Sequence, residues 1–339
     1  MHRALNHKLL FAALTLLLLA EGFTSAYAEK MRLAEAGPTD IKKLIDLVAF
    51  EHAKARGVDY EVKYFKSDDI ASQAIMSGQV DIVISSLGYS AMQAVNAPYR
   101  HIMQLRPLMY YPIVAIDFAK SWKDMNGKDF VVHARASGTE VIAREIEAAN
   151  GIKFSRMSYI PGSQIRANSL LNGTIKATML DIQGMQYVLR KSPEKFVVLP
   201  VPHIPVSEAA LYASTDFLAK NRGQVQILVE ELLKAFRASA SDTKFVASER
   251  TRLNLLPDLA PDLVAEIEPF YLTAAKQGLY PLDGGGEAAA KADLDFYGRI
   301  GVLKGDAASL KVEDYWDLSM LSAALRKVGP ANAPVKAGQ

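Results

Sequence analysis

The hydrophobic positions between residues 31 and 85 switch between strand-like and helix-like spacing. Met31–Ala36 and Glu61–Phe65 have the pattern of short strands, and Val80–Ser85 is a continuous apolar run typical of a strand buried on both faces. Apolar residues recur every three or four positions in Ile41–Arg56 and again between Ser67 and Gly78, which predicts two helices. This alternation of strands and helices is typical of parallel βαβ units.

The same order of elements returns about a hundred residues further along the chain. Three apolar segments predict strands at Phe130–Ala134, Met157–Ile160 and Ile175–Leu180. The helices between them are predicted to begin at Ser137 and to span Ser163–Leu171. The second part of the chain therefore has the same predicted topology as the first.

The two halves also share one junction, where the second helix ends and the third strand begins. Gly78-Gln79-Val80 and Gly173-Thr174-Ile175 each consist of a glycine suited to left-handed backbone, one polar residue and an apolar strand start. This match, found within the same element order, predicts a duplicated α/β topology.

Further apolar segments lie where the chain would pass between the two halves. Leu108–Ile116 predicts a long strand after the first half, and Glu208–Ala213 predicts a returning strand after the strand Phe196–Val201 and a proline-rich stretch. The remaining periodicity predicts helices at Gln224–Ala240, Pro261–Gln277 and Asp314–Val328, with Gly284–Gly286 in a flexible loop between the last two.

These elements predict an α/β fold in which one lobe is interrupted by another. Residues 29–113 and 207–330 form lobe 1, and residues 114–206 form lobe 2. Residues 331–339 are expected to be a loose tail. The two crossing segments would connect the lobes.

The first 28 residues have the three-part pattern of a secretory signal peptide. Arg3 and Lys8 supply a positive start, an apolar run follows, and Ala26-Tyr27-Ala28 places small residues at the cleavage site. The apolar run has about 12 residues, whereas a membrane-spanning helix needs ~20. We expect cleavage after Ala28; the alternative is an uncleaved anchor helix.

Composition narrows the possible chemistry. The chain has 339 residues, 39 basic and 37 acidic residues, and no cysteine. Without cysteine there is no disulfide, thiolate zinc site, thiol nucleophile or attachment point for a lipid anchor. The balanced charge disfavours a nucleic-acid binder. The scattered histidines His52, His101 and His203 do not predict a metal site, and no nucleotide-binding glycine motif or serine nucleophile motif is present, so we expect no cofactor.

Polar residues at the predicted strand ends are the candidate site, because ligands of open α/β sheets bind beyond the carboxyl ends of the strands. Ser137-Gly138-Thr139 begins a helix directly after a strand, so its N–H groups could hold an anion or a carbonyl group. The alternative for this segment is an ordinary helix N-cap. The preceding Arg135 could neutralise an anion or simply be solvated. His133, within an apolar strand, is more typical of a core residue.

The other candidates also have two interpretations. Ser85 and Ser86 could bind a ligand or cap the following helix, and the segment Gly37-Pro38-Thr39 has a similar double interpretation. Asp181 could bind an amine or cap a helix. Tyr110 and Tyr111 are adjacent and would point to opposite faces of a strand, so one of the two would line the site and stack on a planar ligand.

In this order, the motifs resemble the periplasmic substrate-binding proteins of ABC transporters, in the branch that serves nitrate, sulfonates, taurine and thiamin-pyrimidine precursors. The residues that carry the resemblance are Ser67-Asp68, Gly78–Val83, Trp122–Lys128, Ala136–Thr139 and Leu171-Asn172-Gly173. Many relatives have an acidic residue where this chain has Lys176. The resemblance implies a type II periplasmic-binding-protein fold, with two α/β lobes joined by two crossing strands and the C-terminal helices on lobe 1.

The resemblance further implies a function without catalysis. Such a protein would be a periplasmic monomer that captures a small solute and delivers it to a permease, touching the membrane only through that partner. A sulfonate or an aromatic carboxylate is the first expectation for the solute, and a neutral pyrimidine is the second. Two alternatives are a periplasmic sensor for a signalling partner and a thiamin-pyrimidine synthase. The synthases use a cysteine-rich motif, which this chain lacks.

Overall fold

The structure is a computed structural model that describes residues 30–37, 39–85, 88–95, 98–135, 137–201, 205–304 and 309–331. The predicted signal peptide (residues 1–28) and the candidate site residues Pro38 and Ser86 lie outside the described residues. The same holds for the predicted tail from residue 332 onward. Met31–Gln339 forms one compact unit.

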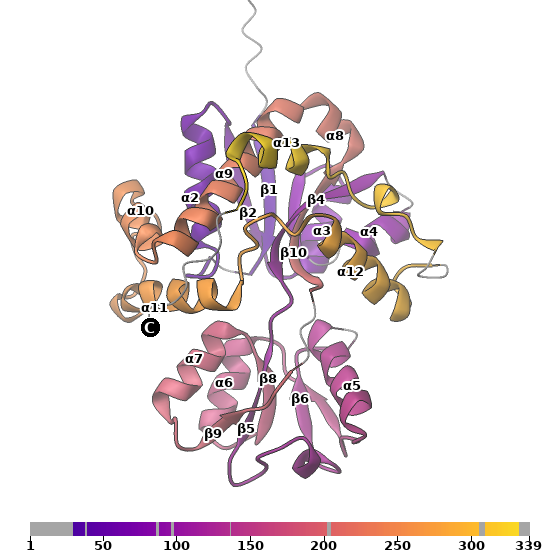
Figure 1. Cartoon of the computed structure of the whole chain (residues 1–339), viewed down its shortest axis with the longest axis vertical. Coiled ribbons are helices and arrows are strands. Elements are labelled where there is room, and N and C mark those ends of the chain that lie inside the picture. Colours follow the sequence, from indigo (N-terminus) through magenta and orange to yellow (C-terminus); the bar gives the residue numbers. More distant parts are fainter. Residues whose placement is uncertain are drawn as a thin grey trace, which may run out of the picture. The chain divides into compact units, whose positions relative to one another are not determined.

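The described strands form two five-stranded sheets (Figure 1). The first has the order β2-β1-β3-β10-β4, and the second has the order β7-β6-β8-β5-β9. The strands of the first sheet are β1 (Met31–Ala36), β2 (Tyr60–Phe65), β3 (Ile82–Ser85), β4 (Tyr99–Pro107) and β10 (Ser207–Ser214). Those of the second sheet are β5 (Tyr111–Ala115), β6 (Phe130–Val132), β7 (Met157–Tyr159), β8 (Ala177–Leu180) and β9 (Phe196–Val198).

Both sheets have the same arrangement of parallel and antiparallel neighbours. In the first, β1 pairs in parallel with β2 and β3, and β10 runs antiparallel to β3 and β4. In the second, β6 pairs in parallel with β7 and β8, and β5 runs antiparallel to β8 and β9. The duplicated α/β topology is therefore confirmed.

The chain passes between the sheets twice. It leaves the first sheet at Pro107 and enters the second at Tyr111, and it returns between Val198 and Ser207. The single long strand predicted at Leu108–Ile116 is wrong in its length, because only β5 is extended there. The lobe boundary predicted after residue 113 falls inside β5, which lies entirely in the second sheet.

The helices cover both faces of each sheet. On the first sheet, α2 and α9 contribute to the core on one face, while α3 and α4 pack on the other. On the second sheet, α5 packs on one face and α6 and α7 on the other. The helices are α2 (Leu44–Ala55), α3 (Asp68–Met76), α4 (Gly88–Val95), α5 (Gly138–Asn150), α6 (Ser163–Leu171), α7 (Ile182–Lys191), α8 (Thr215–Lys220), α9 (Arg222–Ser241), α10 (Phe245–Leu253), α11 (Pro261–Gln277), α12 (Gly286–Arg299) and α13 (Ser319–Val328).

One helix replaces a predicted loop. Gly284 and Gly285 have φ angles of 71° and 78°, in the left-handed region that favours glycine. They form a turn that leads directly into α12, rather than a flexible connection to the next helix. This correction matters for the site, because α12 contributes to its wall.

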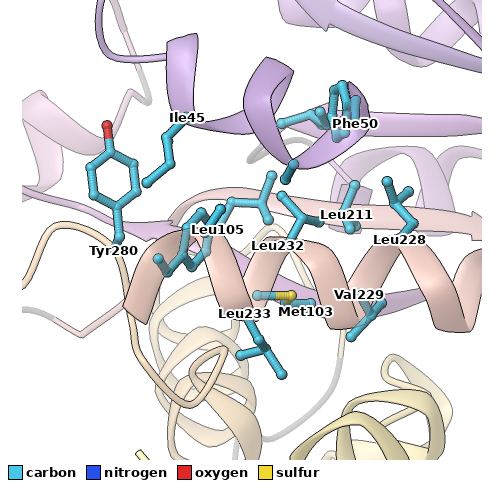
Figure 2. Close-up of a cluster of buried hydrophobic side chains, with 14 of the residues drawn as sticks. Ile45, Phe50, Met103, Leu105, Leu211, Leu228, Val229, Leu232, Leu233 and Tyr280 are labelled. Atoms are coloured by element: carbon cyan, nitrogen blue, oxygen red, sulfur yellow. The ribbon is translucent and has the colours of Figure 1, made fainter. Parts of the chain in front are cut away.

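The largest core lies between α2, α9 and the first sheet (Figure 2). Figure 2 shows Leu228, Leu232 and Leu233 of α9 among side chains from the strands and from α2. The second sheet has its own core clusters, in which Phe130 and Met179 are completely buried. Within the described part of the chain, no helix combines the length and the apolar composition that a membrane crossing requires.

Candidate functional site

A cavity of about 550 Å³ lies at strand ends of both sheets. From the first sheet it is bounded by the ends of β1, β3 and β4 and by the start of β10. From the second sheet it is bounded by the segment between β6 and α5. Phe296 and Tyr297 of α12 and Ile300, which follows that helix, also line it. This is the position that ligands of open α/β sheets occupy.

The structure brings five of the candidate residues together at this cavity. They are Ser85, Tyr110, Arg135, Ser137 and Gly138. Five others are not among its lining residues: Gly37, Thr39, Tyr111, Thr139 and Asp181. Whether any of these side chains contacts a ligand stays a prediction.

The segment Ser137-Gly138-Thr139 forms the N-terminus of α5, as predicted. The Ser137 hydroxyl is the N-cap: it accepts a hydrogen bond from the Glu140 N–H at 3.5 Å and donates one to the Ala134 carbonyl at 2.7 Å. Thr139 is 1% exposed, and its hydroxyl accepts a bond from the His133 N–H at 2.9 Å. The two hydroxyls therefore stabilise the turn between β6 and α5. The N-terminus of α5, at Ser137 and Gly138, lines the cavity.

Asp181 has the same capping role at α7. Its Oδ1 accepts hydrogen bonds from the Gly184 N–H at 2.8 Å and from the Ser163 hydroxyl at 2.9 Å. These contacts join α7 to the start of α6. They correspond to the helix-capping interpretation of this residue.

The side chains of the two adjacent tyrosines, Tyr110 and Tyr111, lie in different surroundings. Tyr110 lines the cavity and packs against the core cluster of the second sheet. Tyr111 packs against the core of the first sheet, and its hydroxyl donates to Gln277 Oε1 at 3.4 Å. The structure thus identifies Tyr110 as the tyrosine of the pair that faces the cavity.

A charged wall on the first sheet was not predicted from the sequence. Arg106 contacts two carboxylates, Asp46 at 2.5 Å and Glu35 at 3.3 Å. Lys43 lies 3.7 Å from the Glu35 carboxylate, and Lys42 donates to Glu208 at 3.0 Å. We call these six residues the charged wall; all except Asp46 line the cavity. Two charged residues inside apolar strand patterns, Glu35 in β1 and Arg106 in β4, were the signals visible in the sequence.

The charged wall is close to neutral when all six groups are ionised, because three cations face three carboxylates. Burial raises the pKa of the Glu35 carboxyl to about 7, although Arg106 and Lys43 act in the opposite direction. Burial also opposes ionisation of Glu208, but Lys42 and Arg106 hold its pKa below the ordinary value. The carboxylates of one wall therefore differ in how easily they take up a proton.

The opposite wall carries a cation of another kind. The Arg135 guanidinium lies 5.0 Å from the centre of the Tyr159 ring, and within the described ranges it forms no ion pair. The neighbouring His133 accepts a hydrogen bond from the Gly162 N–H at Nδ1. Burial and the Arg166 charge lower the pKa of His133, so the ring is neutral near pH 7. Arg135 is thus available to an anionic ligand.

A buried network beneath the cavity holds the start of β10. Asp293 of α12 is completely buried; its Oδ1 accepts from the Ser207 N–H at 2.7 Å and its Oδ2 from the Tyr89 hydroxyl at 3.1 Å. Trp316 donates to the same hydroxyl at 2.5 Å. Glu208, a member of the charged wall, directly follows Ser207. The hydrogen bond between the Ser207 N–H and Asp293 therefore helps to fix the position of Glu208.

The Asp293 carboxyl predicts a pH dependence of stability. Burial raises its pKa to about 7, so the folded protein binds this proton more tightly than the unfolded chain does. The free energy of unfolding should then fall as the pH rises from about 4 to 7. Asp293→Asn removes this contribution. We expect its stability relative to the unmodified protein to rise by about 2 kcal/mol between pH 5 and pH 7, measured by urea unfolding.

The matched control is Asp295→Asn, two positions along α12 on an exposed side chain that contacts Arg299. This variant should keep the pH profile of the unmodified protein. If the free energy of unfolding changed with pH in the same way in Asp293→Asn and in the unmodified protein, a raised pKa at Asp293 would be contradicted.

The described residues contain no group of three or more potential ligands placed to hold a metal ion.

Comparison with known proteins identifies the fold. The sequence matches the family described as NMT1/THI5 like over residues 53–244. No curated protein sequence matches the chain. Among solved structures, it is similar to the periplasmic sulfonate-binding protein SsuA of Methylobacillus flagellatus KT, with 17% identity, a TM-score of 0.66, and 92% of this chain and 99% of that chain covered.

Two further structures are similar in the same way. The periplasmic aliphatic sulphonate binding protein SsuA of Escherichia coli has 15% identity and a TM-score of 0.58, with 85% of this chain and 97% of that chain covered. The periplasmic nitrate-binding protein NrtA of Synechocystis PCC 6803 has 11% identity and a TM-score of 0.61, with 88% and 89% covered. All three are named as binding proteins rather than as enzymes. The predicted type II periplasmic-binding-protein fold is confirmed.

The likeness to these structures establishes the fold, and the match to the family establishes kinship. The family match covers more than half of the chain, including both crossings between the sheets. The protein therefore belongs to the NMT1/THI5-like family.

Proposed function

We propose that this protein is a non-enzymatic solute-binding protein that captures a small solute in the cavity and delivers it to an ABC-type permease. The observation that carries the proposal is a single cavity bounded by strand ends of both sheets. A solute there can contact both halves at once, and only such a ligand shifts a two-lobe protein toward its closed state.

An organic anion, such as a sulfonate or an aromatic carboxylate, is the solute class we favour. Arg135 forms no ion pair in the described part of the chain, and it lies beside the N-terminus of α5, whose N–H groups and dipole favour negative charge. Tyr110 and Tyr297 supply aromatic surface for the body of the solute. Similar structures named as sulfonate-binding and nitrate-binding proteins support this class.

A neutral pyrimidine is the second candidate. The charged wall supports it, because cations already paired with carboxylates offer donors and acceptors side by side with little net charge. Such a wall suits the mixed hydrogen-bonding edge of a heterocycle.

We also propose that the protein acts in the periplasm. Cleavage after Ala28 would release a monomer without a lipid anchor into the periplasm, with the first sheet in one lobe and the second sheet, including β5, in the other. The export pattern of residues 1–28 and the names of the similar periplasmic proteins support this location.

Arg135→Ala tests the anion class. We expect calorimetric titration of the mature protein with benzenesulfonate, butanesulfonate and benzoate to show binding, and the variant to lose affinity by about tenfold to a hundredfold, because a hydrogen bond to a charged group is removed. Affinity for a neutral aminopyrimidine should change little.

The matched control is Arg156→Ala, an exposed arginine of the same half that pairs with Asp129 outside the cavity. It should bind all four compounds as the unmodified protein does. If only the aminopyrimidine bound tightly, and Arg135→Ala did not change its affinity, a neutral pyrimidine would replace the organic anion as the favoured solute class.

A further inference from the structure

Glu35 is the most weakly paired carboxylate of the charged wall. Its nearest cationic atoms lie at 3.3 Å on Arg106 and 3.7 Å on Lys43. By contrast, Asp46 lies 2.5 Å from Arg106, and Glu208 lies 3.0 Å from Lys42. Glu35 is also 4% exposed, and that small surface faces the cavity.

A bound anion would change the charge balance of this wall. The three cations of the wall are already matched by three carboxylates, so an anion that approaches this wall adds a negative charge near Glu35 with no further wall cation to balance it. Like charges in a buried site favour protonation of one of them. The group that yields is the carboxylate that faces the new charge and is held most weakly.

We propose that Glu35 takes up a proton when an anion binds in the cavity, so that anion capture is coupled to proton binding at this one carboxylate. This inference rests on the proposed function, because it needs an anionic solute. It adds a regulation of the same site: anions are captured more tightly as the pH falls.

The groups that face Glu35 support this choice. They are Arg106 from β4, Lys43 and Asp40 from the turn before α2, Asp46 from α2 and Tyr64 from β2. Burial already brings the pKa of Glu35 to about 7, so a further negative charge moves its titration across the neutral range. Glu208 stays ionised, since Lys42 and Arg106 hold its pKa below the ordinary value.

Calorimetry of the mature protein with benzenesulfonate, which stays ionised at every pH used, tests the coupling. Titrations between pH 6 and pH 9 in buffers of different ionisation enthalpy count the protons taken up. We expect uptake to approach about one proton per anion at pH 8 to 9, and the affinity to fall by up to about tenfold per pH unit above pH 7. For Glu35→Gln, we expect no uptake and an affinity that does not change with pH over this range.

Glu61→Gln is the matched control, because it removes an exposed carboxylate that pairs with Lys63 and does not line the cavity. Its proton uptake and pH slope should equal those of the unmodified protein. Binding without proton uptake in the unmodified protein would overturn the inference while leaving the proposed function intact, and so would an unchanged slope in Glu35→Gln. Failure of benzenesulfonate, butanesulfonate and benzoate to bind at any pH would instead contradict the anion class, and the inference with it.

Discussion

Replacement of Arg106 by methionine is expected to lower the free energy of unfolding by about 3–5 kcal/mol at pH 7, the cost of leaving buried charges without their partner. The Arg106 side chain is 2% exposed and contacts both Glu35 and Asp46. Methionine fills much of the same space, so the loss would report the missing charge rather than a cavity. Urea unfolding followed by circular dichroism measures the effect.

Arg190→Met is the matched control for this substitution. Arg190 also forms a short ion pair, 2.6 Å from Glu266, but both side chains are partly exposed to water. An exposed pair contributes about 0–1 kcal/mol, so the control should lose no more than that. Equal losses in the two variants would show that burial does not determine the strength of the Arg106 contacts.

Leu232→Ala is expected to lower the free energy of unfolding by about 2–5 kcal/mol, because it leaves a cavity in the largest core. Leu232 is completely buried on α9, among side chains of α2 and the first sheet (Figure 2). These neighbours come from elements on several sides, so they can move little toward the space that the leucine leaves. Urea unfolding measures the loss.

Leu272→Ala, on α11, is the control with the same chemistry and the same helical setting. Its side chain is 43% exposed, so truncation removes little buried surface and should change stability by less than about 0.5 kcal/mol. A loss of several kcal/mol at Leu272 would indicate that this face of α11 is covered in solution.

Local signals in the sequence predicted most of the repeated elements. β1, α6 and α11 have the bounds that the hydrophobic pattern predicts. The glycine junctions are confirmed as well: Gly78 and Gly173 have φ angles of 73° and 75°, which only a local backbone requirement explains. Such signals are readable because they act within a few residues of the chain.

β4 could not be recognised in the same way. His101, Gln104 and Arg106 interrupt its apolar pattern, yet all three side chains are buried. Their burial depends on partners far away in sequence: the His101 ring stacks on Trp316, Gln104 donates to Ser207, and Arg106 pairs with Glu35 and Asp46. Similarly, α12 follows a run of glycines that resembles a loop until the packing of its buried residues is seen.

The residues of the candidate site fall into the same two groups, those with a local signal and those whose role depends on distant partners. The rule that ligands bind at strand ends found Ser85, Arg135, Ser137 and Gly138, because strand ends can be located from the pattern alone. It did not find the charged wall. Glu35 and Arg106 are charged residues within apolar strand patterns, but only contacts with residues far away in the sequence give the members of the wall their roles.

The sequence by itself determined the α/β class, the duplicated order of strands and helices, and the family, since hydrophobic period and glycine positions are local properties. Only the tertiary structure decided which tyrosine faces the cavity, that the Ser137 and Thr139 hydroxyls are used within their own turn, and that three cations of the site already hold carboxylates. The physical reason is that charge and hydrogen-bond pairing depend on distances in space, and folding brings together groups that the chain keeps far apart.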